Sequence, residues 1–144
     1  LAMYVVFESP LQMLADSPSN YRREPESLEF LRAVPSVWDE TKVLGAQVGE
    51  YILVARRSGR DWYVGALTNW TARDLDVDLS FLGTESFSAE IFRDGANAHR
   101  AGVDYAREEK AVTGAAAWSR FFDEVHGAIR FEWAGGQVPE QVPH

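Results

Sequence analysis

Hydrophobic and polar residues alternate through the middle of the chain. Residues 51–57 and 62–68 are rich in β-branched and aromatic side chains, and a short Gly-containing connection joins them, which is typical of a β-hairpin. Residues 74–81 alternate strictly, with Leu75, Val77, Leu79 and Phe81 between Asp74, Asp76, Asp78 and Ser80. Because successive side chains of a strand point to opposite faces, this pattern predicts a third antiparallel strand with one dry and one wet face.

Further segments have a strand pattern with no helical pattern between them. They are residues 41–48 and 87–92 and, more weakly, residues 111–113 and 128–133. Turn dipeptides separate several of them, for example Asp94-Gly95. Several short strands at near-regular spacing predict a mainly β fold, either an antiparallel β-sandwich with Greek-key-like connections or a partly closed barrel.

The first 36 residues have a helical rather than a β pattern. Residues 2–7 are apolar and compatible with a helix, Pro10 should kink it, and residues 16–20 form a dense turn signal. A second helix is predicted at 24–33, with Pro25 in its first turn. We therefore expect a helical segment at 1–36, a β-domain at 37–134 and a flexible tail at 135–144. The apolar opening, which starts at Leu1 rather than at a methionine, predicts a fragment of a larger core.

Composition narrows the classes of partner. The formal net charge is -8, which argues against nucleic acid and against an anionic membrane surface as partners. The sequence contains no cysteine, so neither a disulfide framework nor a thiolate site is expected. The sequence has no apolar run of the roughly twenty residues that a membrane-spanning helix requires.

No carboxylate pattern predicts catalysis or metal binding. Asp39 and Glu40 are adjacent and should point to opposite sides of an extended connector, and Glu8 is expected to be solvated or ion-paired. Three aspartates and Glu85 imitate the spacing of a calcium loop, but Leu79 stands where that loop needs glycine. The histidines lack zinc-ligand spacing; they are His99, His126 and His144.

Aromatic residues are the candidate contact residues. Trp62, Tyr63 and Trp70 cluster in sequence on the predicted hairpin and its following loop. Exposed rings on a β-sandwich can stack on sugars, but Trp and Tyr are also ordinary core residues. Packing within the core or between domains is the favoured interpretation, and Trp70 is the ring that we expect to be most exposed. An oligosaccharide remains the alternative ligand.

Several segments carry a resemblance to one family. They are VVFESPLQMLADSPSNY, FLRAVPSVWDET, VGEYILVARRSGRDWYVGALTNWTARDLDVDLSFL and AEIFRDGANAHRAGVDY. Together they resemble the C-terminal region of glycoside hydrolase family 97. The resemblance implies a bacterial, periplasmic or secreted α-glucosidase or α-galactosidase. In that family a large N-terminal β-domain precedes a (β/α)₈ barrel, and the two hold the catalytic carboxylates beside a calcium ion. Residues 1–36 would be the end of that barrel, and the β-domain would pack against it and form homo-oligomers.

The resemblance carries no catalytic or metal-binding residue onto this chain, because the family's carboxylates lie upstream of Leu1. We therefore expect a non-catalytic domain of a glycoside hydrolase, inactive on its own, with the catalytic barrel and further subunits as its partners. The alternative is an independent carbohydrate-binding module with a β-sandwich fold. Residues 114–120 and the segment after them resemble the family poorly.

Overall fold

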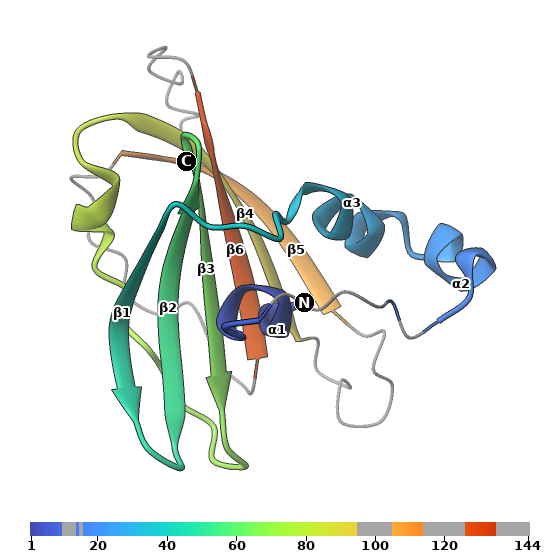
Figure 1. Ribbon diagram of the computed structural model, residues 1–144, viewed down its shortest axis with the longest axis horizontal. Coiled ribbons are helices and arrows are strands. Elements are labelled where there is room, and N and C mark those ends of the chain that lie inside the picture. The colour runs from blue at the N-terminus through green and yellow to red at the C-terminus, as the bar shows by residue number, and fades with distance from the viewer. Residues whose placement is uncertain (10–13, 15, 95–104, 114–125, 135–144) are drawn as a thin grey trace, which may run out of the picture.

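The computed structural model describes residues 1–9, 14, 16–94, 105–113 and 126–134. Three short helices precede a sheet of six strands (Figure 1). The elements in chain order are α1 (Ala2–Val6), α2 (Pro18–Arg23), α3 (Pro25–Ala33), β1 (Glu40–Gln47), β2 (Tyr51–Ser58), β3 (Asp61–Thr68), the 3₁₀ helix η1 (Leu79–Leu82), β4 (Ser86–Asp94), β5 (Tyr105–Thr113) and β6 (His126–Trp133). The predicted kink at Pro10, the turn at Gly95 and the predicted tail at 135–144 lie outside the described residues.

The six strands form one antiparallel sheet in the order β1-β2-β3-β6-β4-β5. The predicted hairpin turn joins β2 to β3, and a second tight turn joins β1 to β2. Gly59 and Gly49 take up positive φ angles of 61° and 78° in these turns, as tight turns between antiparallel strands require. The mainly β, antiparallel class is confirmed, and the order is not sequential because β6 lies between β3 and β4. In the described part of the chain, helices cover one face of this sheet and a loop segment covers the other, and neither face is covered by a second sheet.

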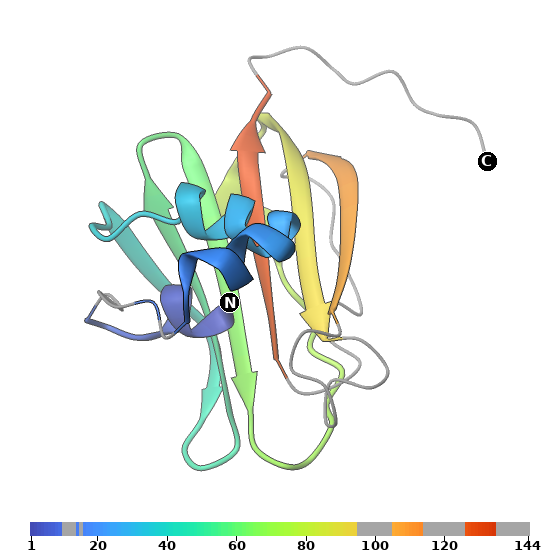
Figure 2. The ribbon, with the colours of Figure 1, turned by 90° about the vertical axis from the view of Figure 1, so that its right-hand side faces the viewer.

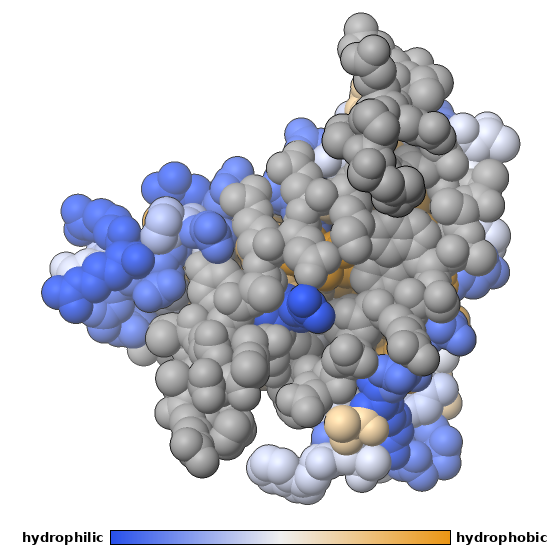
Figure 3. Space-filling model, turned by 180° about the vertical axis from the view of Figure 1, so that it is seen from behind, coloured by the Kyte–Doolittle hydropathy of each residue, from blue (hydrophilic) through white to orange (hydrophobic). Residues whose placement is uncertain are grey.

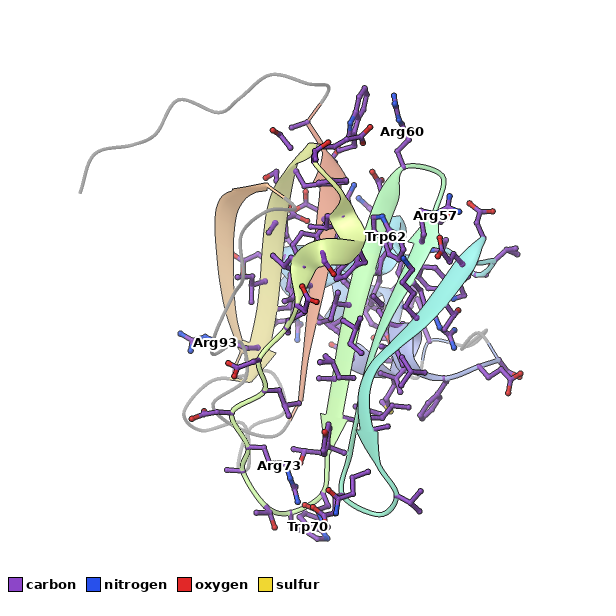
Figure 4. All side chains as sticks on the ribbon, turned by 90° about the vertical axis from the view of Figure 1, so that its left-hand side faces the viewer. Arg57, Arg60, Trp62, Trp70, Arg73 and Arg93 are labelled. Atoms are coloured by element: carbon purple, nitrogen blue, oxygen red, sulfur yellow. The ribbon has the colours of Figure 1, made fainter. Side chains whose placement is uncertain are left out.

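On one face, a core lies between the sheet and the segment around η1 (Figure 4). Leu79 is fully buried and Val77 almost so, and both pack against side chains of the sheet. The sheet contributes apolar residues from β2, β3, β4 and β6, among them Leu53, Val64, Ala89, Ile91, Ile129 and Phe131. The segment around η1 therefore closes this core as a lid of irregular backbone.

The prediction of a hydrogen-bonded strand at 74–81 is wrong. Only Val77 forms a bridge, and the chain then turns into η1, where the Asp78 carboxylate caps the helix by accepting from the Ser80 N–H at 2.9 Å. The predicted alternation of burial is nevertheless correct, since Val77 and Leu79 are buried and Asp76 and Asp78 exposed. An extended segment alternates in the same way without pairing, so periodicity alone does not separate the two states.

The helices lie on the opposite face of the sheet (Figure 2). Helices α1 and α3 fall where they were predicted. The turn-rich sequence at 16–20 starts helix α2, because the Ser17 hydroxyl accepts from the Asn20 N–H at 3.4 Å and Pro18 occupies the first turn. The exposed outer end of this helical segment is hydrophilic (Figure 3, left). Among the described residues no helix is both long and apolar enough to span a bilayer.

Candidate interaction sites

Helix α1 lies directly on the backbone of β3, at Gly65. A Cβ atom at this position would lie 2.8 Å from Val5 Cβ, 2.9 Å from Val6 Cγ2 and 3.2 Å from the Ala2 carbonyl oxygen. Real Cβ atoms are not found so close to such atoms, and α1 would have to move away to admit one. Only glycine therefore allows the helix to approach the sheet this closely.

Arg56 on β2 binds the C-terminal end of α1. Its Nη1 donates to the Phe7 carbonyl at 2.8 Å and its Nη2 to the Val6 carbonyl at 3.5 Å, and the residue is only 6% exposed. These carbonyls have no partner within the helix, and a cation at this end also complements the helix dipole. Burial lowers the pKa of Arg56, and the charge of Glu8 opposes that shift. The carboxylate of Glu8 thus acts electrostatically on the residue that holds α1.

Tyr63 on β3 joins α3 and the following connector to the sheet. Its hydroxyl donates to the Ala33 carbonyl at 3.0 Å, at the end of α3. Its ring meets Phe30 of α3 edge-on, with centroids 6.4 Å apart, and Trp38 of the connector, with centroids 5.3 Å apart. Tyr63 therefore contacts both the helical segment and the connector.

Tyr63→Phe should destabilise the protein by about 1 kcal/mol at neutral pH, because the hydrogen bond to Ala33 is lost. Burial also raises the pKa of Tyr63 above its ordinary value of 10.0. The unfolded chain ionises first, so the contribution of Tyr63 is complete below pH 10 and is lost as pH rises through the folded-state pKa. In urea unfolding, the stability gap between wild type and Tyr63→Phe should therefore narrow above pH 10. A gap that stays constant with pH would contradict this.

Asp39 and Glu40 do not point apart as expected, because both carboxylates bind Arg57. Glu40 Oε2 lies 3.2 Å from Arg57 Nε, and Asp39 Oδ2 lies 3.7 Å from Arg57 Nη1 and accepts from the Gly59 N–H at 2.7 Å. The hydrogen bond from Arg57 lowers the pKa of Glu40. Asp39 precedes the first residue of β1, so strand alternation does not apply to it. The pair secures the β2–β3 turn.

The three aromatic candidates are not brought together. Trp62 and Tyr63 are neighbours on a strand and point to opposite faces; Trp62 is 5% exposed and packs under η1, 4.8 Å from the Phe81 ring centroid. Trp70 is fully exposed at the other end of the sheet, beside Arg73 (Figure 4). Of the three rings, therefore, only Trp70 is available to a ligand or to another protein.

Sequence reasoning missed the residues that hold the helices, Arg56 and Gly65. The glycine carried a signal, because a lone glycine inside a strand rich in bulky residues often marks close approach of another backbone. Arg56 carried none, since an arginine in a strand is ordinarily exposed. In the described part of the chain, no group of three or more metal-ligating side chains is placed to hold a metal ion.

Comparison with known proteins identifies the family to which this chain is similar. Residues 37–129 match the family described as "Glycosyl-hydrolase 97 C-terminal, oligomerisation". The chain is 62% identical over 105 residues to a "Retaining alpha-galactosidase" of Bacteroides thetaiotaomicron, a match that covers 73% of this chain and 16% of that protein. It is 34% identical over 95 residues to a "Probable retaining alpha-galactosidase" of Streptomyces bingchenggensis, covering 66% of this chain and 15% of that protein.

Solved structures of the same family have a similar fold. A glycoside hydrolase family 97 enzyme from Pseudoalteromonas sp. strain K8, in complex with acarbose, superposes with a TM-score of 0.82 at 36% identity, covering 92% of this chain and 22% of that chain. The chain spans less than a quarter of each of these relatives. The resemblance found in the sequence is thereby confirmed, and the chain belongs to glycoside hydrolase family 97, whose C-terminal oligomerisation domain it contains.

Proposed function

We propose that this chain is the non-catalytic C-terminal domain of a bacterial α-galactosidase, periplasmic or secreted, and that it holds the end of the catalytic part in place. The observation that carries the proposal is the attachment of α1 and α3 to the sheet. Gly65 admits α1, Arg56 binds its last carbonyls and Tyr63 binds the end of α3. Calcium and the reacting carboxylates would belong to the part that precedes Leu1.

Four carboxylates of the described residues support a structural role. Glycosidases need two carboxyl groups facing one sugar across a gap of roughly 5–9.5 Å. Here Asp39 and Glu40 bind Arg57, Glu50 binds Arg73 at 2.6 Å and Glu90 binds Arg130 at 3.4 Å. Carboxylates that are each paired with an arginine are arranged for holding strands and loops together rather than for proton transfer.

The substrate class follows from the relatives. Both curated relatives have names that contain "retaining alpha-galactosidase", and one is 62% identical over most of this chain. The Pseudoalteromonas enzyme was solved with acarbose, and for this reason α-glucosides are the second candidate class of substrate. We therefore assign α-galactosides, hydrolysed with retention of configuration, to the whole polypeptide.

The test compares hydrolysis of an aryl α-galactoside by the isolated chain and by the full-length polypeptide. The isolated chain should be inactive and the full-length polypeptide active. In the full-length polypeptide, Gly65→Ala should lower the temperature of half-inactivation by several degrees, because overpacking under α1 costs about 1–3 kcal/mol.

Gly45→Ala is the matched control. Gly45 lies on β1, and a Cβ there would meet only the Tyr51 side chain at 3.4 Å, an ordinary contact. This variant should keep the wild-type inactivation temperature. Hydrolysis by the isolated chain, or equal inactivation temperatures for the Gly65 and Gly45 variants, would contradict the proposed function.

A further inference from the structure

Two fully exposed hydrophobic side chains lie at one end of the sheet. Val48 is in the β1–β2 turn and Trp70 is in the loop after β3, and both residues are fully exposed. The two segments are joined, since the Asn69 N–H donates to the Glu50 carbonyl at 2.7 Å and Asn69 Nδ2 to the Gly49 carbonyl at 3.1 Å. We call residues 47–50 and 68–73 the Trp70 tip.

Arg73 fixes the shape of the Trp70 tip. Its Nη1 donates to Thr68 Oγ1 at 2.8 Å and to Asn69 Oδ1 at 2.7 Å, and its Nη2 lies 2.6 Å from Glu50 Oε2. The loop that carries Trp70 is thus bound to the β1–β2 turn by the side chains of Asn69 and Arg73. An exposed indole on a braced loop loses little conformational entropy on binding, which favours a role in recognition.

The polar groups around Trp70 argue against a sugar. A sugar site combines a stacking ring with polar groups that are directed at the hydroxyls of the ligand. Here Glu50 Oε1 accepts from Gln47 and Oε2 from Arg73, while Asn69 Oδ1 accepts from the Thr71 N–H and from Arg73. These groups satisfy one another and leave the ring as an apolar surface, which suits a protein partner.

The charge of the Trp70 tip indicates which kind of partner protein it can bind. Glu50 and Arg73 are its only charged residues and they pair with each other, whereas the whole chain has a formal net charge of -8. Two such acidic chains repel one another least where their surfaces are neutral. A hollow of about 380 Å³, lined by residues 46–52 and 67–69 with mostly apolar surface, adjoins the tip. A protruding ring beside an apolar hollow is self-complementary, as a two-fold contact requires.

We infer that the Trp70 tip is the contact with a second copy of this chain, with Trp70 of each copy seated in the hollow of the other. This inference rests on the proposed function, in which the chain is the C-terminal domain of a family 97 enzyme, and it names the surface through which that domain would assemble. Residues 37–129, which match the oligomerisation domain, contain the whole tip. The contact is small, so the tip on its own gives a weak dimer.

The test is sedimentation velocity of the full-length polypeptide between about 1 and 100 µM. The wild type should dimerise with rising concentration, and Trp70→Ala should weaken the dimer about 10- to 100-fold, the effect of losing a central aromatic anchor. Val48→Asp should weaken it as well, because it places two like charges in the contact. Hydrolysis should remain at the wild-type level in both variants, and this separates loss of the contact from failure of the proposed function.

Val37→Ala is the control, because Val37 is 75% exposed and precedes β1, at the end of the sheet remote from the tip. It should dimerise like the wild type. A wild type that stays monomeric, or a Trp70→Ala variant that dimerises as tightly as the wild type, would overturn the inference. So would binding of a galacto- or malto-oligosaccharide that Trp70→Ala abolishes while the association state stays unchanged, since the ring would then belong to a sugar site.

Discussion

Phe30→Ala should destabilise the protein by about 3–5 kcal/mol, the usual cost of deleting a buried aromatic ring. Phe30 is fully buried between α3 and the sheet, edge-on to Phe92 at 5.1 Å and to Tyr63 at 6.4 Å. The cavity would lie where the helical segment meets the sheet, and the loss should appear in urea unfolding as a lower midpoint with an unchanged slope.

Phe7→Ala is the matched control for Phe30→Ala. Phe7 follows α1 and is 41% exposed, so its deletion should cost less than about 1 kcal/mol. Equal losses for the two variants would mean that α3 is not packed on the sheet. A large loss of unfolding free energy for Phe30→Ala alone would show that the buried ring of Phe30 holds the helical segment on the sheet.

Leu79→Ala should destabilise the protein by about 2–5 kcal/mol, because Leu79 is fully buried under η1. The expected loss is large although η1 makes no strand pairing, since the side chain fills the core that the irregular segment closes. Thermal unfolding followed by near-ultraviolet circular dichroism would measure it, since Trp62 and Phe81 pack at 4.8 Å beside the same core.

Asp76→Ala separates this core role from the exposed side of the same segment. Asp76 is exposed, and its substitution should change stability by no more than about 0.5 kcal/mol. A loss for Asp76→Ala comparable with that for Leu79→Ala would show that the aspartates of this segment are structural. A small loss for Leu79→Ala would mean that η1 does not close the core.

Local sequence was enough to locate the paired strands. The segments predicted at 41–48, 51–57, 62–68, 87–92 and 128–133 correspond to β1, β2, β3, β4 and β6, because β-branched and aromatic runs between turn residues have few other stable states. The weak prediction at 111–113 is the end of a longer strand, β5. The first part of β5 was not predicted because its sequence is rich in charged residues. A strand at the edge of a sheet, such as β5, tolerates these residues.

The contacts between distant segments could not be predicted in the same way. Arg56 and the Phe7 carbonyl are separated by 49 positions, and nothing local to either residue indicates the other. The bracing of Trp70 likewise depends on Arg73 and on Glu50, which lies 23 positions before Arg73. The sequence predicted an exposed Trp70, but only the tertiary structure shows that its loop is held in one shape.

The position of β6 has a consequence for how the chain folds. β6 is the last of the described strands to be synthesised, yet it pairs with β3 on one side and β4 on the other. Until it is made, the β1–β3 meander and the β4–β5 hairpin each present an unpaired inner edge to the solvent. Such edges recruit strands from other chains, so the nascent domain is most prone to aggregation just before its central strand arrives.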